Sequence, residues 1–181
     1  MALIKRYKSK IYGNYWLGIL KFGFLIGFGL SFILIFRRWL DDPINQPVGF
    51  IENFAMLGLI FISVYLYKLG LAERRITFKE SYIVGFGSGV FGSVIYGMSL
   101  YGYALYLDHG LQNRCFDVQR AIESNSHLSN ADIMYMTTPQ SIALSGIMLS
   151  SIMAILWAMV VGVLLRNEKG EIISKDKKFK I

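Results

Sequence analysis

The side chains that could carry chemistry gather in one polar stretch, residues 108–140. Both histidines, His109 and His127, lie there with the acidic residues Asp108, Asp117, Glu123 and Asp132. Their spacing matches no metal-ligand motif such as H-E-x-x-H, and no serine lies in a G-x-S-x-G elbow. We therefore predict no catalytic, cofactor-binding or metal site. The least favoured hypothesis, a lipid-modifying or intramembrane enzyme, would depend on these acids and histidines.

The single cysteine, Cys115, excludes an internal disulfide framework and a thiolate zinc cluster. It lies on an apolar stripe at helical spacing, which predicts a short amphipathic helix. We expect a buried, inert thiol, with a reactive thiol or an intermolecular disulfide as the alternatives. Ser129 and Asp132 form a capping-box pattern that predicts a second short helix. The stripe consists of Leu111, Cys115, Val118 and Ile122.

The elements that must position these residues are four long apolar runs. Hydrophobic residues make up 54% of the 181 residues and charged residues only 17%. A membrane-spanning helix needs roughly 20 predominantly apolar residues. We therefore predict an all-α fold, an integral membrane bundle of four transmembrane helices, with short amphipathic helices in the loop 108–140. The whole chain, 1–181, is expected to form one membrane domain, with spans at about 12–36, 48–67, 82–107 and 141–165.

The 19 basic residues predict the orientation of these spans. Fourteen lie in residues 1–11, 68–81 and 166–181, four lie in the two other connectors, and Lys21 lies inside the first span. The positive-inside rule then predicts that both termini are cytoplasmic and that the loop 108–140 is extracytoplasmic. The net charge of +7 is therefore an orientation signal and not a nucleic-acid footprint. We expect Lys21 to snorkel towards the headgroups, and the basic tail to attract anionic lipids at the cytoplasmic face.

Two polar residues near the outer end of the second span are candidate functional groups, Glu52 and Asn53. Ionisable residues within spans are functional candidates by default. Glu52 lies only about one turn from the predicted boundary, so we favour a water-exposed face over a buried functional charge. A G-x-G-x-x-G pattern at residues 87–92 lies inside a span and not between a strand and a helix, so we discard it as a nucleotide motif.

Small residues recur every four positions in the spans and form flat faces that let helix backbones approach. We predict that the third and fourth spans pack through these faces against each other or against a partner. Capping patterns place helix starts at Thr77, three residues before Glu80, and at Thr138, which precedes a proline. The predicted packing residues are Gly85, Gly89, Ser93 and Gly97 in the third span, and Gly146, Ser150, Ala154, Ala158 and Gly162 in the fourth.

Three segments resemble a family of small, four-span bacterial inner-membrane proteins catalogued as domain of unknown function 4199. They are residues 21–23, which enter the glycine-rich first span, the basic connector 74–80 leading into residues 82–85, and Thr137-Thr138-Pro139 before the last span. The resemblance implies a four-helix bundle in a bacterial inner membrane. It implies no activity and no catalytic residues.

The surplus of packing faces and the lack of a catalytic constellation favour a non-enzymatic accessory, assembly or scaffold component of a membrane complex. Its partners would be the lipid bilayer and either another membrane protein or further copies of itself. The alternative is a small oligomeric transporter or channel in which Glu52 and the serine–glycine faces line a path.

Overall fold

The computed structural model describes residues 15–40, 44–71, 75–122 and 125–166, and these are helical with short connectors and no strand. Four helices are long and apolar enough to cross a membrane. The fold is therefore all-α, and the protein is a multi-pass membrane protein. The spanning helices are α2 (Tyr15–Trp39), α3 (Phe50–Gly70), α4 (Phe78–Gly102), which continues as the π-helix η1 (Tyr103–Leu107), and α7 (Pro139–Leu165).

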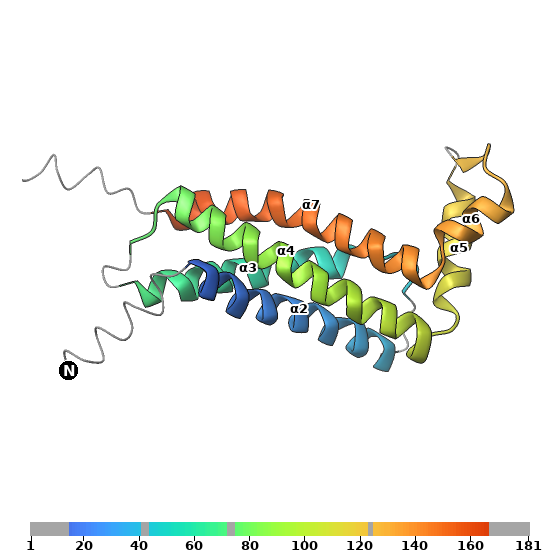
Figure 1. Cartoon of the computed structure of the whole chain (residues 1–181), viewed down its shortest axis with the longest axis horizontal. Helices are drawn as coiled ribbons and strands as arrows, with labels where there is room; N and C mark the ends of the chain where they lie inside the picture. Colours follow the sequence, from blue (N-terminus) through green and yellow to red (C-terminus); the bar gives the residue numbers. More distant parts are fainter. Residues whose placement is uncertain (1–14, 41–43, 72–74, 123–124, 167–181) are drawn as a thin grey trace, which may run out of the picture.

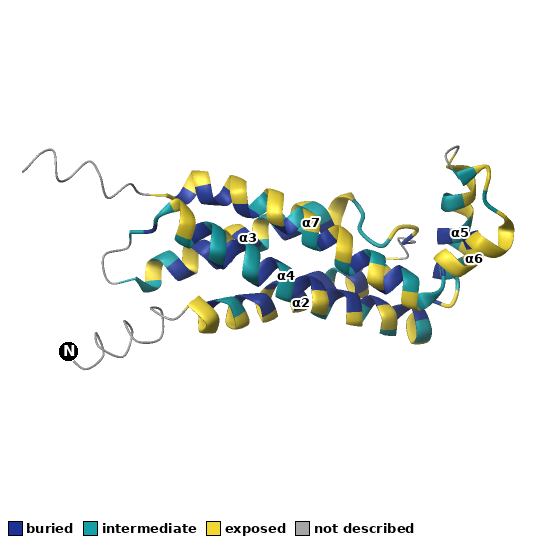
Figure 2. Cartoon of the chain, turned by 45° about the horizontal axis from the view of Figure 1, so that its top comes forward, coloured by how far each residue is buried: buried dark blue, intermediate teal, exposed yellow. Residues whose placement is uncertain are grey.

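The four long helices lie side by side, and two short helices lie across one end of them (Figure 1). These are α5 (Leu111–Ala121) and α6 (Asn130–Met136), and we call that end of the bundle the α5–α6 end. Helix α4 packs against both α2 and α7, while α3 contacts the other three spanning helices. Exposed residues lie along the outer sides of the bundle and buried residues face its interior (Figure 2). Lys21 is among the exposed residues of α2, as a snorkelling side chain requires.

The capping patterns set where two spanning helices begin. Thr77 Oγ1 accepts a hydrogen bond from the Glu80 amide at 3.3 Å, and Glu80 Oε2 accepts one from the Thr77 amide at 2.8 Å. Thr138 caps α7 with Pro139 in the first turn. Both predicted caps are confirmed, and they start α4 and α7 a few residues before the apolar runs begin. The predicted start of the first span, at residue 12, lies outside the described residues.

The small residues let α4 approach its neighbours closely. A Cβ atom added at Gly89 would lie 2.6 Å from Ala154 Cβ, and one added at Gly85 would lie 3.3 Å from Ala158 Cβ. The predicted faces of α4 and α7 thus lie against each other, and all nine of their residues are buried: Gly85, Gly89, Ser93, Gly97, Gly146, Ser150, Ala154, Ala158 and Gly162. On the other side of α4, Gly27 of α2 approaches the carbonyl of Gly92.

The polar stretch forms two short helices, as expected, but the first is shorter than its stripe. Leu111 and Cys115 are buried, whereas Ile122 is 41% exposed and lies beyond the end of α5. The prediction for Ile122 is wrong because Asn125 Nδ2 donates to the carbonyl of Gln119 at 3.1 Å, which ends the helix. The second helix, α6, begins with the predicted capping box of Ser129 and Asp132.

Candidate functional site at the α5–α6 end

Glu52 is held at the start of α3 by two partners. Its Oε1 atom accepts a hydrogen bond from Arg37 Nη1 at 2.7 Å, and its Oε2 atom accepts one from the Gly49 amide at 3.0 Å. The Glu52 side chain is only 2% exposed, so the expected water-exposed face is wrong. A carboxylate tolerates such burial when a cation pairs with it. Sequence reasoning counted Arg37 only as an orientation signal and so missed this ion pair.

Asn53, the second candidate, connects α3 to α7. Its Oδ1 atom accepts a hydrogen bond from Trp157 Nε1 at 2.8 Å. At the same end of the bundle, the hydroxyl of Tyr96 in α4 donates to the carbonyl of Pro47 at 2.8 Å. Both contacts join elements that are far apart in the sequence. The polar groups of this region therefore hold the helices and the connector 44–49 together.

Asp108, the first residue of the polar stretch, forms a second ion pair. Its carboxylate pairs with Arg114 and also accepts hydrogen bonds from the Tyr103 hydroxyl at 3.1 Å and the Gly110 amide at 3.2 Å. Arg114 in turn donates from Nε to the carbonyl of Ile44 at 2.8 Å. This network joins α5 to both η1 and the connector 44–49, and it leaves Asp108 engaged in structural contacts.

The other ionisable residues of the stretch stay apart. His109, His127 and Asp117 are exposed, and Glu123 lies outside the described residues. Hydrogen bonds from the Ser129 side chain and amide lower the pKa of Asp132, which caps α6. In the described part of the chain, no three histidine, cysteine or acidic side chains come together as a metal site.

Cys115 is buried, as predicted, beneath the connector 44–49. Its side chain is 4% exposed, and Sγ donates to the carbonyl of Asn45 at 3.4 Å. Burial raises the pKa of the Cys115 thiol to about 11, in opposition to the nearby guanidinium of Arg114. The thiol is therefore protonated near neutral pH, and a protonated thiol is a poor nucleophile.

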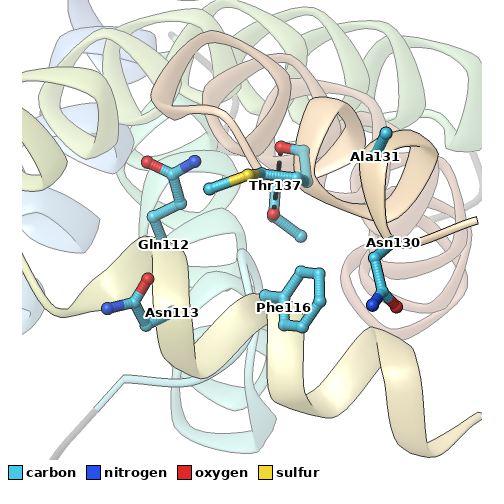
Figure 3. A pocket seen from close by; sticks show the side chains of 7 residues that line it. Gln112, Asn113, Phe116, Asn130, Ala131 and Thr137 are labelled. Carbon is cyan, nitrogen blue, oxygen red and sulfur yellow. Dashed lines mark hydrogen bonds between the residues drawn. The ribbon is translucent and has the colours of Figure 1, made fainter.

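A pocket of about 300 Å³ lies between α5 and α6 (Figure 3), and we call it the amide-rimmed pocket. Phe116 lies between two groups of carboxamides, with Gln112 and Asn113 on one side and Asn130 on the other. The structure gives none of these three carboxamides a hydrogen bond to another described residue. None of the lining residues is charged; they are Gln112, Asn113, Phe116, Asn130, Ala131, Met134 and Thr137.

A second pocket of about 140 Å³ adjoins the first at Thr137, and we call it the interface pocket. The connector 44–49, α5, the end of α6 and the first turns of α7 line it. Sequence reasoning missed both pockets, although the neutral polar residues on one face of α5 were a signal for them. The residues lining the interface pocket are Asn45, Gln46, Pro47, Cys115, Gln119, Met136, Thr137, Ile142, Ser145 and Leu149.

With this geometry in place, comparison with known proteins identifies the family. The sequence model of one family, described as "Protein of unknown function (DUF4199)", matches residues 21–167. The chain belongs to the DUF4199 family. The resemblance seen in the sequence is thereby confirmed. None of the curated proteins and none of the solved structures that were compared matches the chain.

The region matched to DUF4199 includes both ion pairs and both pockets, and it ends just after α7. The family description assigns no activity, so it adds no catalytic or binding residue to those seen in the structure. The function of the chain therefore depends on the chemistry of its own site.

Proposed function

We propose that this DUF4199 protein is a non-enzymatic component of a membrane assembly, with an accessory, assembly or scaffold role. We place it in the bacterial inner membrane with both termini in the cytoplasm, since 14 of its 19 basic residues lie in the segments that this orientation puts inside. The α5–α6 end then faces the extracytoplasmic side, where a partner's soluble or membrane-bound segment can reach it.

The amide-rimmed pocket is the observation that supports this role most strongly. Interfaces combine an apolar centre with a polar rim, and a few side chains seated in pockets dominate the binding energy. Phe116 and Met134 supply apolar surface, while three carboxamides supply both donors and acceptors. A partner could insert an apolar side chain here and bond its main chain to the rim.

The bundle interior supports the same role because most of its buried polar groups are already engaged, with the Ser81 hydroxyl as the exception among the described residues. Glu52 is bonded to Arg37, Asn53 to Trp157, and the hydroxyl of Ser93 to the carbonyl of Gly89. The small-residue faces are also occupied by packing within the chain. At the α5–α6 end, by contrast, the carboxamides of Gln112, Asn113 and Asn130 make no hydrogen bond to another described residue.

The alternative, a small oligomeric transporter or channel, depended on Glu52 as a path-lining acid. The structure gives this carboxylate two partners, Arg37 in the last turn of α2 and the Gly49 amide. Groups that serve transport usually lie near the membrane midplane on broken helices. The bonded state of Glu52 therefore favours the assembly role over the transport role.

Co-purification from native membranes tests the assembly role with a matched pair of variants. Ala131 lines the amide-rimmed pocket, so Ala131→Trp should fill it, whereas Ala121→Trp places the same bulk on an exposed site outside it. Wild type and Ala121→Trp should recover the same companion protein in a fixed ratio, and Ala131→Trp should lose it. Recovery of all three only as a lone chain would contradict the proposal.

At the opposite end of the bundle we propose contact with anionic lipids. Lys79 and Arg166 are exposed there, and the four lysines of residues 175–180 lie outside the described residues. Each basic residue near an anionic surface contributes about 1 kcal/mol of attraction, which salt screens. High salt should therefore expose the tail to protease in anionic vesicles but make no difference in neutral vesicles.

A further inference from the structure

The interface pocket lies at the level where α7 enters the membrane. Thr137 precedes the first residue of α7, while Ser145 and Leu149 lie six and ten residues into that helix. At 1.5 Å per residue, these positions are about 9 Å and about 15 Å along the helix from its start. The headgroup region of a leaflet is only about 5–8 Å deep. The pocket therefore extends from the connector 44–49 down to the upper part of the lipid chains.

Ser145 in the wall of this pocket differs from most of the buried serines of the bundle, although the buried Ser81 hydroxyl also lacks a partner. Ser31, Ser88 and Ser93 each donate to the carbonyl of the residue four positions earlier, at 2.6–2.8 Å. The Ser145 hydroxyl has no hydrogen bond to any described residue, although it lies within a spanning helix. An unsatisfied polar group in hydrocarbon is unfavourable by several kcal/mol. A hydroxyl at this position thus calls for a polar partner from the bilayer.

Three carboxamides add further polar groups to this wall. The side chains of Asn45 and Gln46 make no hydrogen bond to described residues, and Gln119 uses only its Oε1 atom, as an acceptor from Asn125. Leu149, which lies deeper along α7 than Ser145, provides apolar surface. The pocket therefore offers hydrogen bonds at its top and apolar contact at its bottom, which is the polarity of a lipid molecule.

The lack of charged residues in the lining of the interface pocket favours some lipid headgroups over others. None of the ten residues that line the pocket carries a charge at neutral pH. The guanidinium of Arg114, which adjoins Cys115 on α5, is engaged by Asp108 and the carbonyl of Ile44. A phosphate group would therefore find no cation in this pocket, whereas an uncharged, hydroxyl-bearing group would find donors and acceptors.

We propose that the interface pocket binds one glycerolipid with an uncharged, hydroxyl-bearing headgroup from the leaflet at the α5–α6 end. The headgroup and glycerol bond Ser145, Gln46 and Gln119, and a chain follows the apolar surface at Leu149. A volume of about 140 Å³ accommodates only part of the headgroup, so the rest of the lipid lies along the exposed side of α7. This site is separate from the partner contact proposed for the amide-rimmed pocket.

Native mass spectrometry of the full-length protein released from lipid nanodiscs tests this site. The nanodiscs contain phosphatidylcholine with equal minor fractions of monoglucosyl diacylglycerol and phosphatidylglycerol. Wild type should retain one glucosyl lipid in preference to phosphatidylglycerol. Ser145→Ala should lower that retention about fivefold, the effect of one lost hydrogen bond, and Ser145→Leu should abolish it.

Matched variants separate the site from general effects on the helix. Ser151 is half-buried in the same helix and does not line the pocket, so Ser151→Ala should retain the glucosyl lipid as wild type does. Gln46→Ala alters the connector without touching a spanning helix and should also lower retention, which keeps the test valid if Ser145→Leu does not fold. Equal retention of the glucosyl lipid by wild type, Ser145→Ala and Gln46→Ala would overturn the proposal, as would a preference for phosphatidylglycerol that Ser145→Ala abolishes.

Discussion

The guanidinium of Arg37 lies 2.7 Å from the carboxylate of Glu52 and joins the last turn of α2 to the first turn of α3. Both side chains are largely shielded, with exposed fractions of 13% and 2%. The charged ends of two spanning helices thus neutralise each other where the connector 44–49 turns the chain back. This contact gives a polar pair in the membrane domain a structural role.

Removing one partner of this pair should destabilise the bundle strongly. Glu52→Ala removes the carboxylate that pairs with the shielded Arg37 guanidinium, and breaking a buried ion pair in this way typically destabilises by about 3–5 kcal/mol. Arg38 is the adjacent cation and is exposed, so Arg38→Ala should change stability by less than about 1 kcal/mol. Unfolding by sodium dodecyl sulfate in mixed micelles measures both variants. Equal stability of the two would show that the ion pair is not required.

A larger side chain at Gly89 should push α4 away from α7. A Cβ atom added at Gly89 would lie 2.6 Å from Ala154 Cβ, whereas one added at Gly58 meets nothing within 4 Å. Gly89→Leu should therefore lower the midpoint of thermal unfolding in detergent, with a destabilisation of about 1–3 kcal/mol or more. Gly58→Leu adds the same side chain without a clash and should be neutral. The packing account fails if Gly89→Leu is as stable as Gly58→Leu.

Cys115 should resist alkylation until the pH is high. Its thiol pKa of about 11 leaves little thiolate at pH 7, so maleimide should label native protein slowly and faster as the pH rises towards 11. Ser126 is exposed, and Ser126→Cys should react quickly at pH 7 as the positive control. Rapid labelling of wild type at pH 7 would contradict the buried, protonated thiol.

The same burial makes stability depend on pH. The folded thiol holds its proton more tightly than an unfolded thiol, whose pKa is about 8.5. Its contribution to stability is therefore complete below about 8.5 and is lost as the pH rises through the folded pKa of about 11. Cys115→Ala should remove this alkaline dependence, as measured by unfolding at a series of pH values.

The hydrogen bond between Trp157 and Asn53 should couple α7 to α3. A double-mutant cycle with Asn53→Ala and Trp157→Phe isolates the pair, and hydrogen bonds between membrane helices contribute about 0.6 kcal/mol on average, with a maximum of about 1.7. We expect a coupling energy in this range from unfolding in mixed micelles. Additive effects of the two substitutions would show that the 2.8 Å contact contributes nothing.

Local patterns predicted the elements of this fold well, because helix caps and apolar length are encoded by neighbouring residues. Thr77 with Glu80, and Thr138 with Pro139, placed the starts of α4 and α7. The end of α5 was missed because it depends on Asn125, which returns to bond Gln119 after the chain has turned.

The site was harder to predict because it depends on contacts between distant segments. The burial of Glu52 follows from Arg37 in the preceding helix, and that pairing requires the connector between them to turn back. The pockets depend on how α5 lies against α6 and α7, which no local pattern specifies. The uncharged polar residues on one face of α5 distinguished this face from the rest of the helix, but they did not show which elements it contacts.

The size of the particle released intact from native membranes tests the central claim most directly. A component of an assembly should migrate well above the mass of the 20.6 kDa chain, together with a fixed companion or further copies of itself. Filling the amide-rimmed pocket with Ala131→Trp should convert that particle to the single chain. A wild-type protein that is released only as one 20.6 kDa chain would contradict the account.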